Sequence, residues 1–88
     1  MVRGNVTVIN KAGLHARAAS KLVTLTSTFA SKIQVGHKKM VDGKSILSLM
    51  MLAAGQGTEL TIETSGSDEQ QALEATLTLI KDGFGEPE

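Results

Sequence analysis

A histidine and an arginine stand two residues apart in the run Gly13-Leu14-His15-Ala16-Arg17, where a strand pattern gives way to a helix pattern. A helix N-terminus attracts anions, because its first backbone N–H groups are unpaired and the helix dipole is positive there. Arginine adds a permanently charged fork of donors, and histidine is a nucleophile that is largely neutral near pH 7. The run therefore predicts a phosphate site, in which His15 either binds a phosphoryl group or carries it covalently.

Each of these two side chains also has a simpler interpretation. A lone histidine in a loop is usually only a solvated side chain, and an arginine near the start of a helix is often a charge that faces water. The position of Arg17 is unfavourable by itself, since a cation at a helix N-terminus opposes the dipole by about 0.3–1 kcal/mol. An anion that contacts both the helix and Arg17 would offset this cost.

The composition argues against several classes of function. Nine basic and nine acidic side chains cancel, so the chain lacks the positive charge that binds nucleic acids and membrane surfaces. The only aromatic residues are Phe29 and Phe84, which removes the platforms on which nucleic-acid bases stack. With no cysteine and two histidines, a metal site has little ligand support, and we expect neither a metal nor a cofactor.

The length predicts a single domain over residues 1–88, because 88 residues suffice for one compact core and are too few for two. The N-terminal residues lack the apolar run of a secretory signal, and no stretch approaches the ~20 apolar residues of a membrane span. We therefore expect a cytoplasmic protein that does not insert into membranes.

Apolar periodicity predicts four strands and three helices. Alternating or β-branched residues favour strands over 6–9, 33–35, 39–41 and 59–63. Apolar residues at helical spacing favour a helix that starts at Ala16 and continues to Phe29, and a second helix over 46–52. A third helix is expected after Ser67, which forms a capping box with Gln70, and before Gly83.

The resulting order is β-α-β-β-α-β-α. Because alternating strands leave one face of a sheet polar, the three helices should share the other face in an open two-layer sandwich. The loop that carries His15 and the start of the second helix could then lie at the same end of the sheet, a point that the sequence leaves open.

The second predicted helix carries two features of its own. Ser45 precedes it and is most simply an N-cap, with a site of modification as the less favoured alternative. The seven residues from Ile46 to Leu52 include six apolar ones, which is more than a one-sided surface helix can bury. Some of these side chains should therefore face water, although simple core packing explains about half of them.

Two separated motifs give the chain a resemblance to HPr, the histidine-containing phosphocarrier family of the bacterial phosphoenolpyruvate:sugar phosphotransferase system. The run Gly13-Leu14-His15-Ala16-Arg17 resembles the family's active-site histidine signature, and Gly43-Lys44-Ser45-Ile46-Leu47-Ser48-Leu49 resembles its serine-site signature. The likeness covers essentially the whole chain. One departure is Ala18, where many members have a proline that would stiffen the first turn of the helix.

The resemblance implies an α+β fold, an antiparallel sheet in the order 1-4-2-3, and a site that works by covalent transfer. In the family, the histidine takes a phosphoryl group from phosphorylated enzyme I and passes it to a sugar-specific enzyme IIA. This implies that His15 is the phosphoryl acceptor, at Nδ1, and that Arg17 stabilises the phosphate. The carrier would then act as a substrate of larger enzymes more than as an independent catalyst.

The resemblance also implies roles for the second helix. In many relatives the serine that matches Ser45 is phosphorylated by an HPr kinase/phosphorylase, and a dianion there would be favoured by the helix start while opposing partner binding. Ile46, Leu47 and Met50 would face partner proteins, while Leu49 and Leu52 would point to the core. Methionine suits such a surface because its side chain adapts its shape.

The main hypothesis is thus a phosphoryl carrier, expected to be a monomer because transient exchange requires ready release. Two alternatives remain open. One is the nitrogen-related branch of the family, with a mainly regulatory role. The other is a non-catalytic regulatory module that docks proteins while His15 is inactive.

Overall fold

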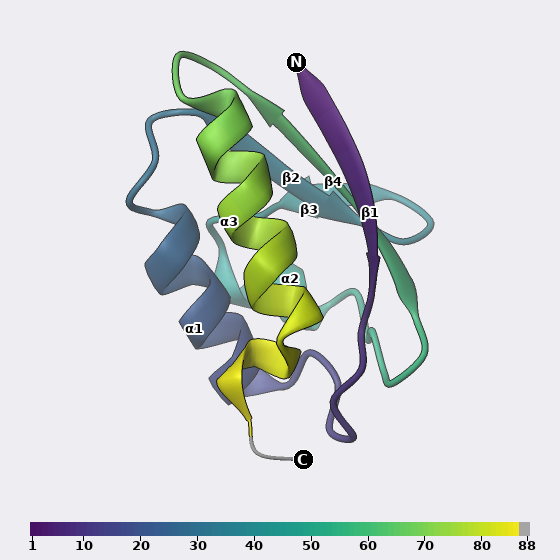
Figure 1. Ribbon diagram of the computed structural model, residues 1–88. Coiled ribbons are helices and arrows are strands. Elements are labelled where there is room, and N and C mark those ends of the chain that lie inside the picture. Colours follow the sequence, from purple (N-terminus) through teal and green to yellow (C-terminus); the bar gives the residue numbers. More distant parts are fainter. Residues whose placement is uncertain (87–88) are drawn as a thin grey trace.

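The computed structural model describes residues 1–86, in which three α-helices lie over one face of a four-stranded sheet (Figure 1). The elements in chain order are β1 (Val2–Thr7), α1 (Ala16–Thr26), β2 (Lys32–Gly36), β3 (Met40–Asp42), α2 (Ile46–Met50), β4 (Glu59–Ser65), α3 (Glu69–Lys81) and the short 3-10 turn η1 (Gly83–Gly85). The sheet is antiparallel in the order β1-β4-β2-β3. The predicted fold class and strand order are therefore confirmed.

The buried face of the sheet follows from the alternation of buried and accessible side chains along β4, one of its two inner strands. In β4 the side chains of Leu60, Ile62 and Thr64 are buried, while the residues between them are at least partly accessible. Strand β4 pairs with β1 on one side and β2 on the other, which places Ile62 opposite Val35. This register directs one apolar face of the sheet toward the helices, where the core forms.

The core lies between the sheet and the helices. Its largest fully buried side chains include Phe84, Leu22, Leu49 and Ile80, one from η1 and one from each helix. Burial of each such side chain stabilises the fold by about 1.5–3 kcal/mol relative to exposure. Within residues 1–86, no helix combines the length and apolar character needed to cross a membrane.

The bounds of the first strand and of the first helix differ from the sequence prediction. The first strand spans Val2–Thr7 instead of 6–9, because its pairing with β4 begins at Val2 and its N-terminal residues alternate less clearly in type. Helix α1 ends at Thr26, so Phe29 lies beyond it and packs on the core from the following turn. The hydroxyl of Thr26 donates to the carbonyl of Gly43 at 2.8 Å, which ties this helix end to the segment before α2.

The capping box predicted for the third helix is wrong. Asp68 and not Ser67 occupies the N-cap position, and its side chain makes no capping bond. Its carboxylate instead accepts from the backbone N–H groups of Ala30 and Ser31, at 3.0 and 2.9 Å, and from the Ser31 hydroxyl. The carboxylate of Asp68 therefore bonds a segment distant in sequence, and not the N-terminal amides of its own helix.

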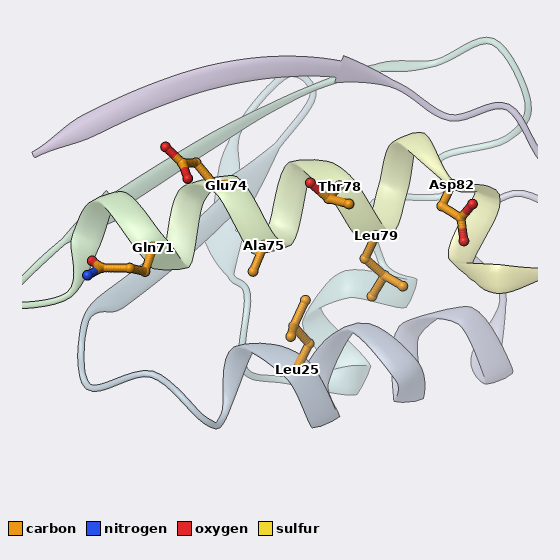
Figure 2. Close-up of a pocket in the computed structure, with 7 residues that line it drawn as sticks. All are labelled: Leu25, Gln71, Glu74, Ala75, Thr78, Leu79 and Asp82. Carbon is orange, nitrogen blue, oxygen red and sulfur yellow. The ribbon is translucent and has the colours of Figure 1, made fainter.

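A shallow groove runs between α1 and α3 (Figure 2). In Figure 2, Leu25 of α1 points toward Ala75 and Leu79 of α3, Glu74 points away from Leu25, and Asp82 follows the C-terminal end of α3. Leu25, Ala75 and Leu79 are each only half-buried. The apolar contact between the two helices therefore remains partly accessible to solvent.

Asp68 predicts an acid-sensitive contribution to stability. Hydrogen bonds from the Ser31 hydroxyl and from the amides of Ala30 and Ser31 lower the pKa of Asp68 below its usual 3.8. A lowered folded-state pKa means that the unfolded chain binds the proton more readily, so this stabilisation is present above pH 3.8 and is lost as pH falls through the lowered pKa.

The variant Asp68→Asn should therefore be less stable than the wild type at neutral pH, and the difference should shrink as the solution is acidified below about pH 4. Urea unfolding at a series of pH values measures this difference. Asp82→Asn, which changes an exposed carboxylate at the other end of α3, is the control. A gap between Asp68→Asn and wild type that stays constant with pH would contradict the assignment.

Candidate functional site

His15 is the N-cap residue of α1. Its backbone is extended, with φ −82° and ψ −179°, and its ring nitrogen Nδ1 accepts a hydrogen bond from the backbone N–H of Arg17 at 3.2 Å. The imidazole therefore satisfies one of the unpaired donors of the first helical turn. The side chain is 26% exposed, which leaves the ring accessible from solution.

The other ring nitrogen of His15 contacts a carboxylate that no pattern in the sequence indicates. Nε2 lies 2.8 Å from Oε2 of Glu86, and the same oxygen lies 3.5 Å from Nε of Arg17. The side-chain amide of Asn10 donates to Oε1 of Glu86 at 2.9 Å. Glu86 is thus held by three polar side chains and is only 6% exposed.

These partners fix the arrangement of protons on the ring. The Asn10 hydrogen bond, followed by the hydrogen bond and charge of His15 and the charge of Arg17, lowers the pKa of Glu86 against the opposing effect of burial. An ionised carboxylate can only accept, and the backbone N–H of Arg17 can only donate. The hydrogen-bond pattern therefore assigns the proton of the His15 ring to Nε2 and leaves a lone pair on Nδ1.

Glu86 reaches the site because the chain reverses after α3 (Figure 1). Gly83, Phe84 and Gly85 all have left-handed backbones, with φ of 67°, 60° and 72°. A non-glycine residue in this region costs about 1–3 kcal/mol, and the complete burial of the Phe84 ring offsets that cost. Lys21 of α1 also donates to the Phe84 carbonyl at 3.1 Å.

The loop before His15 is held from two sides. The amide of Asn10 donates to the carbonyl of Gly13 at 2.9 Å, and Asn10 is itself fully buried. The backbone N–H of Leu14 donates to the carbonyl of Ala54 at 2.8 Å, just beyond the C-terminal end of α2. The sequence marked Asn10 and Gly13 only as turn residues, and their contacts show that they also anchor the site.

Ser45 is the N-cap of α2, as predicted: its hydroxyl oxygen accepts from the backbone N–H of Ser48 at 3.2 Å. The sequence left open whether the start of this helix lies beside the His15 loop, and the structure places it elsewhere. The start of α2 lies beside the end of α1, where Lys44 donates to the Phe29 carbonyl at 2.7 Å. Because α1 has 11 residues and is therefore about 16 Å long, the end of α1 beside Lys44 lies well away from His15 at its start.

The apolar residues of α2 divide as the resemblance implies. Ile46, Leu47 and Met50 are exposed, with Leu47 at 70%, and Leu49 is fully buried. Leu52 is half-buried against the core and follows the helix, which ends at Met50, two residues before the predicted boundary. Met51 is also exposed, which extends the apolar surface beyond the three predicted residues.

Comparisons with known proteins agree with this geometry. The family described as the PTS HPr component phosphorylation site matches residues 2–82. A phosphocarrier protein HPr from Cupriavidus necator is 49% identical over 89 residues, which span 100% of both chains. A phosphocarrier protein NPr from Proteus mirabilis is 37% identical and covers 92% of each chain.

Solved structures agree as well. The crystal structure of HPr-C-His from Thermoanaerobacter tengcongensis has a TM-score of 0.95 and 38% identity, and each chain covers 100% of the other. A crystal structure of an HPr dimer from the same organism has a TM-score of 0.77 and 39% identity, and covers 98% of this chain and 100% of its own. The expectation of a monomer for the present chain stays a prediction.

Gly13 provides a test of how the loop is held. Its φ is +67°, and a Cβ atom at this position would lie 2.5 Å from the Ala54 carbonyl oxygen. Gly57 also has a positive φ, +91°, but a Cβ atom there would meet nothing within 4 Å. The two glycines therefore separate the cost of backbone conformation from the cost of the clash.

We expect Gly57→Ala to lower the free energy of unfolding by about 1–2 kcal/mol and Gly13→Ala to lower it by more. Chemical denaturation of both variants measures the difference. Equal losses would show that the contact with Ala54 does not constrain the loop.

Proposed function

Because this chain belongs to the HPr family, we propose that it is a phosphoryl carrier of the phosphoenolpyruvate-dependent phosphotransferase system, with His15 as the residue that is phosphorylated. The observation that carries the proposal is the state of the His15 ring. Its Nδ1 has an available lone pair that faces the N-terminal amides of α1, and Arg17 stands beside it. A nucleophile, an anion-binding helix end and a permanent cation thus meet at one accessible point.

The transfer step follows from this geometry. The Nδ1 lone pair attacks the phosphorus of a phosphohistidine on the donor protein, the donor's N–P bond breaks, and its electron pair returns to the donor nitrogen. The proton on Nε2 of His15 stays in place. Passage of the group to an acceptor histidine is the same step in reverse, with His15 as the leaving group.

The helix end changes partners during this step. In the unmodified protein, the backbone N–H of Arg17 donates to Nδ1. Once Nδ1 bonds to phosphorus its lone pair is used, and a phosphoryl oxygen takes over as acceptor for this N–H. The guanidinium of Arg17 is 75% exposed and free to turn toward the new oxygens. Both donors thus stabilise negative charge during transfer.

The proposal includes its partners. Phosphorylated enzyme I is the donor and enzyme IIA is the acceptor, and the carrier acts in the cytoplasm with no cofactor of its own. Ile46, Leu47 and Met50 form the docking face, since they are exposed apolar side chains on one short helix. Ser45 at the start of that helix is the regulatory site, where an HPr kinase/phosphorylase would add a charge.

A nitrogen-branch role is the second candidate. Its support is the likeness to the phosphocarrier protein NPr, at 37% identity, against 49% for the phosphocarrier protein HPr. Both branches use the same histidine chemistry, so identification of the acceptor that takes the phosphoryl group from His15 distinguishes them.

The central prediction concerns phosphorylation with phosphoenolpyruvate and enzyme I. Wild-type protein should gain one acid-labile phosphate, His15→Ala should gain none, and Arg17→Ala should be phosphorylated about 100-fold more slowly because one stabilising donor is lost. Mass spectrometry and rapid-quench kinetics measure the two effects.

The chain supplies matched controls, since it has one other histidine and one other arginine. His37 is exposed at the β2–β3 turn, and Arg3 pairs with Glu63 on the sheet. His37→Ala and Arg3→Ala should therefore accept phosphate at the wild-type rate. Acid-labile phosphate on His15→Ala would refute the assignment of the acceptor.

The docking face gives a second prediction. Ser45→Asp keeps an acceptor at the N-cap, so the fold should persist, while the charge beside Leu47 should weaken binding to enzyme I about tenfold. Leu47→Glu should do the same. The readout is the dissociation constant for enzyme I, with the thermal midpoint as the measure of folding.

Gln71→Glu places the same charge on an exposed position of α3 and serves as the control. If Ser45→Asp and Leu47→Glu both bind enzyme I as tightly as Gln71→Glu does, α2 is not the docking face.

A further inference from the structure

The side chain of Glu86 touches both residues of the proposed site from a part of the chain 71 residues away from His15. We propose that Glu86 is a positioning residue for phosphoryl transfer: its carboxylate holds the proton of His15 on Nε2, orients the ring so that Nδ1 is the nucleophile, and stabilises the positive charge that the ring gains when Nδ1 bonds to phosphorus.

The contacts of the carboxylate are those of an orienting group. Oε1 is occupied by the buried amide of Asn10 at 2.9 Å, so the carboxylate cannot rotate freely. Oε2 is thereby directed at Nε2 of His15, at 2.8 Å. A carboxylate that accepts from one nitrogen of an imidazole fixes the tautomer and the orientation of the ring.

The backbone holds Glu86 in place before any partner arrives. The Phe84 ring is fully buried two residues earlier, and Lys21 of α1 bonds the carbonyl of Phe84 at 3.1 Å. The segment after α3 thus contacts α1 and its cap through Phe84 on one side of Gly85 and through Glu86 on the other. Little conformational freedom remains to be lost during the reaction, which is the requirement for a preorganised site.

Glu86 and the phosphoryl group do not compete for the same ring atom. The carboxylate lies at Nε2, whereas the Nδ1 lone pair faces the N-terminus of α1. The distance of 3.5 Å from Oε2 to Nε of Arg17 is long for a hydrogen bond, so Arg17 can turn to the incoming oxygens while Glu86 stays on the ring.

The charge balance of the transfer gives the carboxylate its role. When the neutral ring forms an N–P bond through Nδ1 and keeps its proton on Nε2, the ring becomes an imidazolium. The carboxylate 2.8 Å from Nε2 faces this new positive charge. The interaction strengthens as the bond forms, so it lowers the barrier instead of only tightening binding.

Glu86 can act in this way only if His15 is the phosphoryl acceptor proposed above, and two readouts keep the two ideas apart. The first is the single-turnover rate of transfer from phosphorylated enzyme I to the full-length wild type, Glu86→Gln, Glu86→Ala and Glu74→Gln. The second is the NMR resonance of the His15 Nε2 proton, which requires no partner protein. Glu74 is exposed on α3 and bonds only Gln70 among the residues described, which makes Glu74→Gln a matched control.

We expect both Glu86 variants to transfer about tenfold more slowly, the usual consequence of losing a carboxylate that orients a functional histidine. The concentration of carrier at half-maximal rate should be unchanged, since the side chain of Glu86 is only 6% exposed and is not part of the proposed docking face. The slowly exchanging, downfield Nε2 proton of the wild type should be lost in Glu86→Ala, and Glu74→Gln should match the wild type in both readouts.

Two results would overturn this role. Unchanged rates in both variants would show that the contact is dispensable, and faster transfer would show that the carboxylate competes with the phosphoryl group. A wild type that gains no phosphate at His15 would instead refute the proposed function, while the Nε2 proton would still report whether the contact with Glu86 exists.

Discussion

The first turn of α1 needs a hydrogen-bond acceptor, and the ring of His15 supplies it through Nδ1. Most helices use a serine, threonine, aspartate or asparagine for this purpose, and none of those side chains has a nitrogen nucleophile. The use of histidine places a reactive lone pair directly at the positive end of a helix dipole. Structure and proposed chemistry therefore depend on the same contact, because the atom that caps the helix is also the atom that we propose to be phosphorylated.

The rest of the fold constrains this contact from two directions. Gly13 and Leu14 pack and bond against Ala54, which fixes the approach of the chain to α1. The end of α3 returns through Phe84 to place a carboxylate on the opposite side of the ring. This carboxylate also faces Arg17, whose charge is otherwise unfavourable at a helix N-terminus. The chain itself thus provides an anion that partly offsets the cost of a cation at this position.

Local pattern was sufficient for the fold class, since alternation in β4 and the apolar spacing of the helices determine which faces are buried. It also predicted the place of His15 and Arg17 at the start of α1 and the N-cap of Ser45, because the contacts that define these positions are local in sequence. Local pattern failed where contacts between distant parts of the sequence determine the partner of a side chain. Asp68 bonds Ser31 instead of capping α3, and Glu86 reaches His15 only because a left-handed turn reverses the chain. No local pattern around Glu86 indicates such a partner.

The position of the phosphoryl group on the ring tests the central claim most directly. Protein labelled with 15N in its histidines and phosphorylated by enzyme I can be examined by NMR, because coupling between phosphorus and nitrogen identifies the bonded atom. The account predicts that the phosphoryl group is on Nδ1 of His15, with the proton of the ring on Nε2. A phosphoryl group on Nε2 would contradict it, because that product requires the carboxylate of Glu86 to leave the ring.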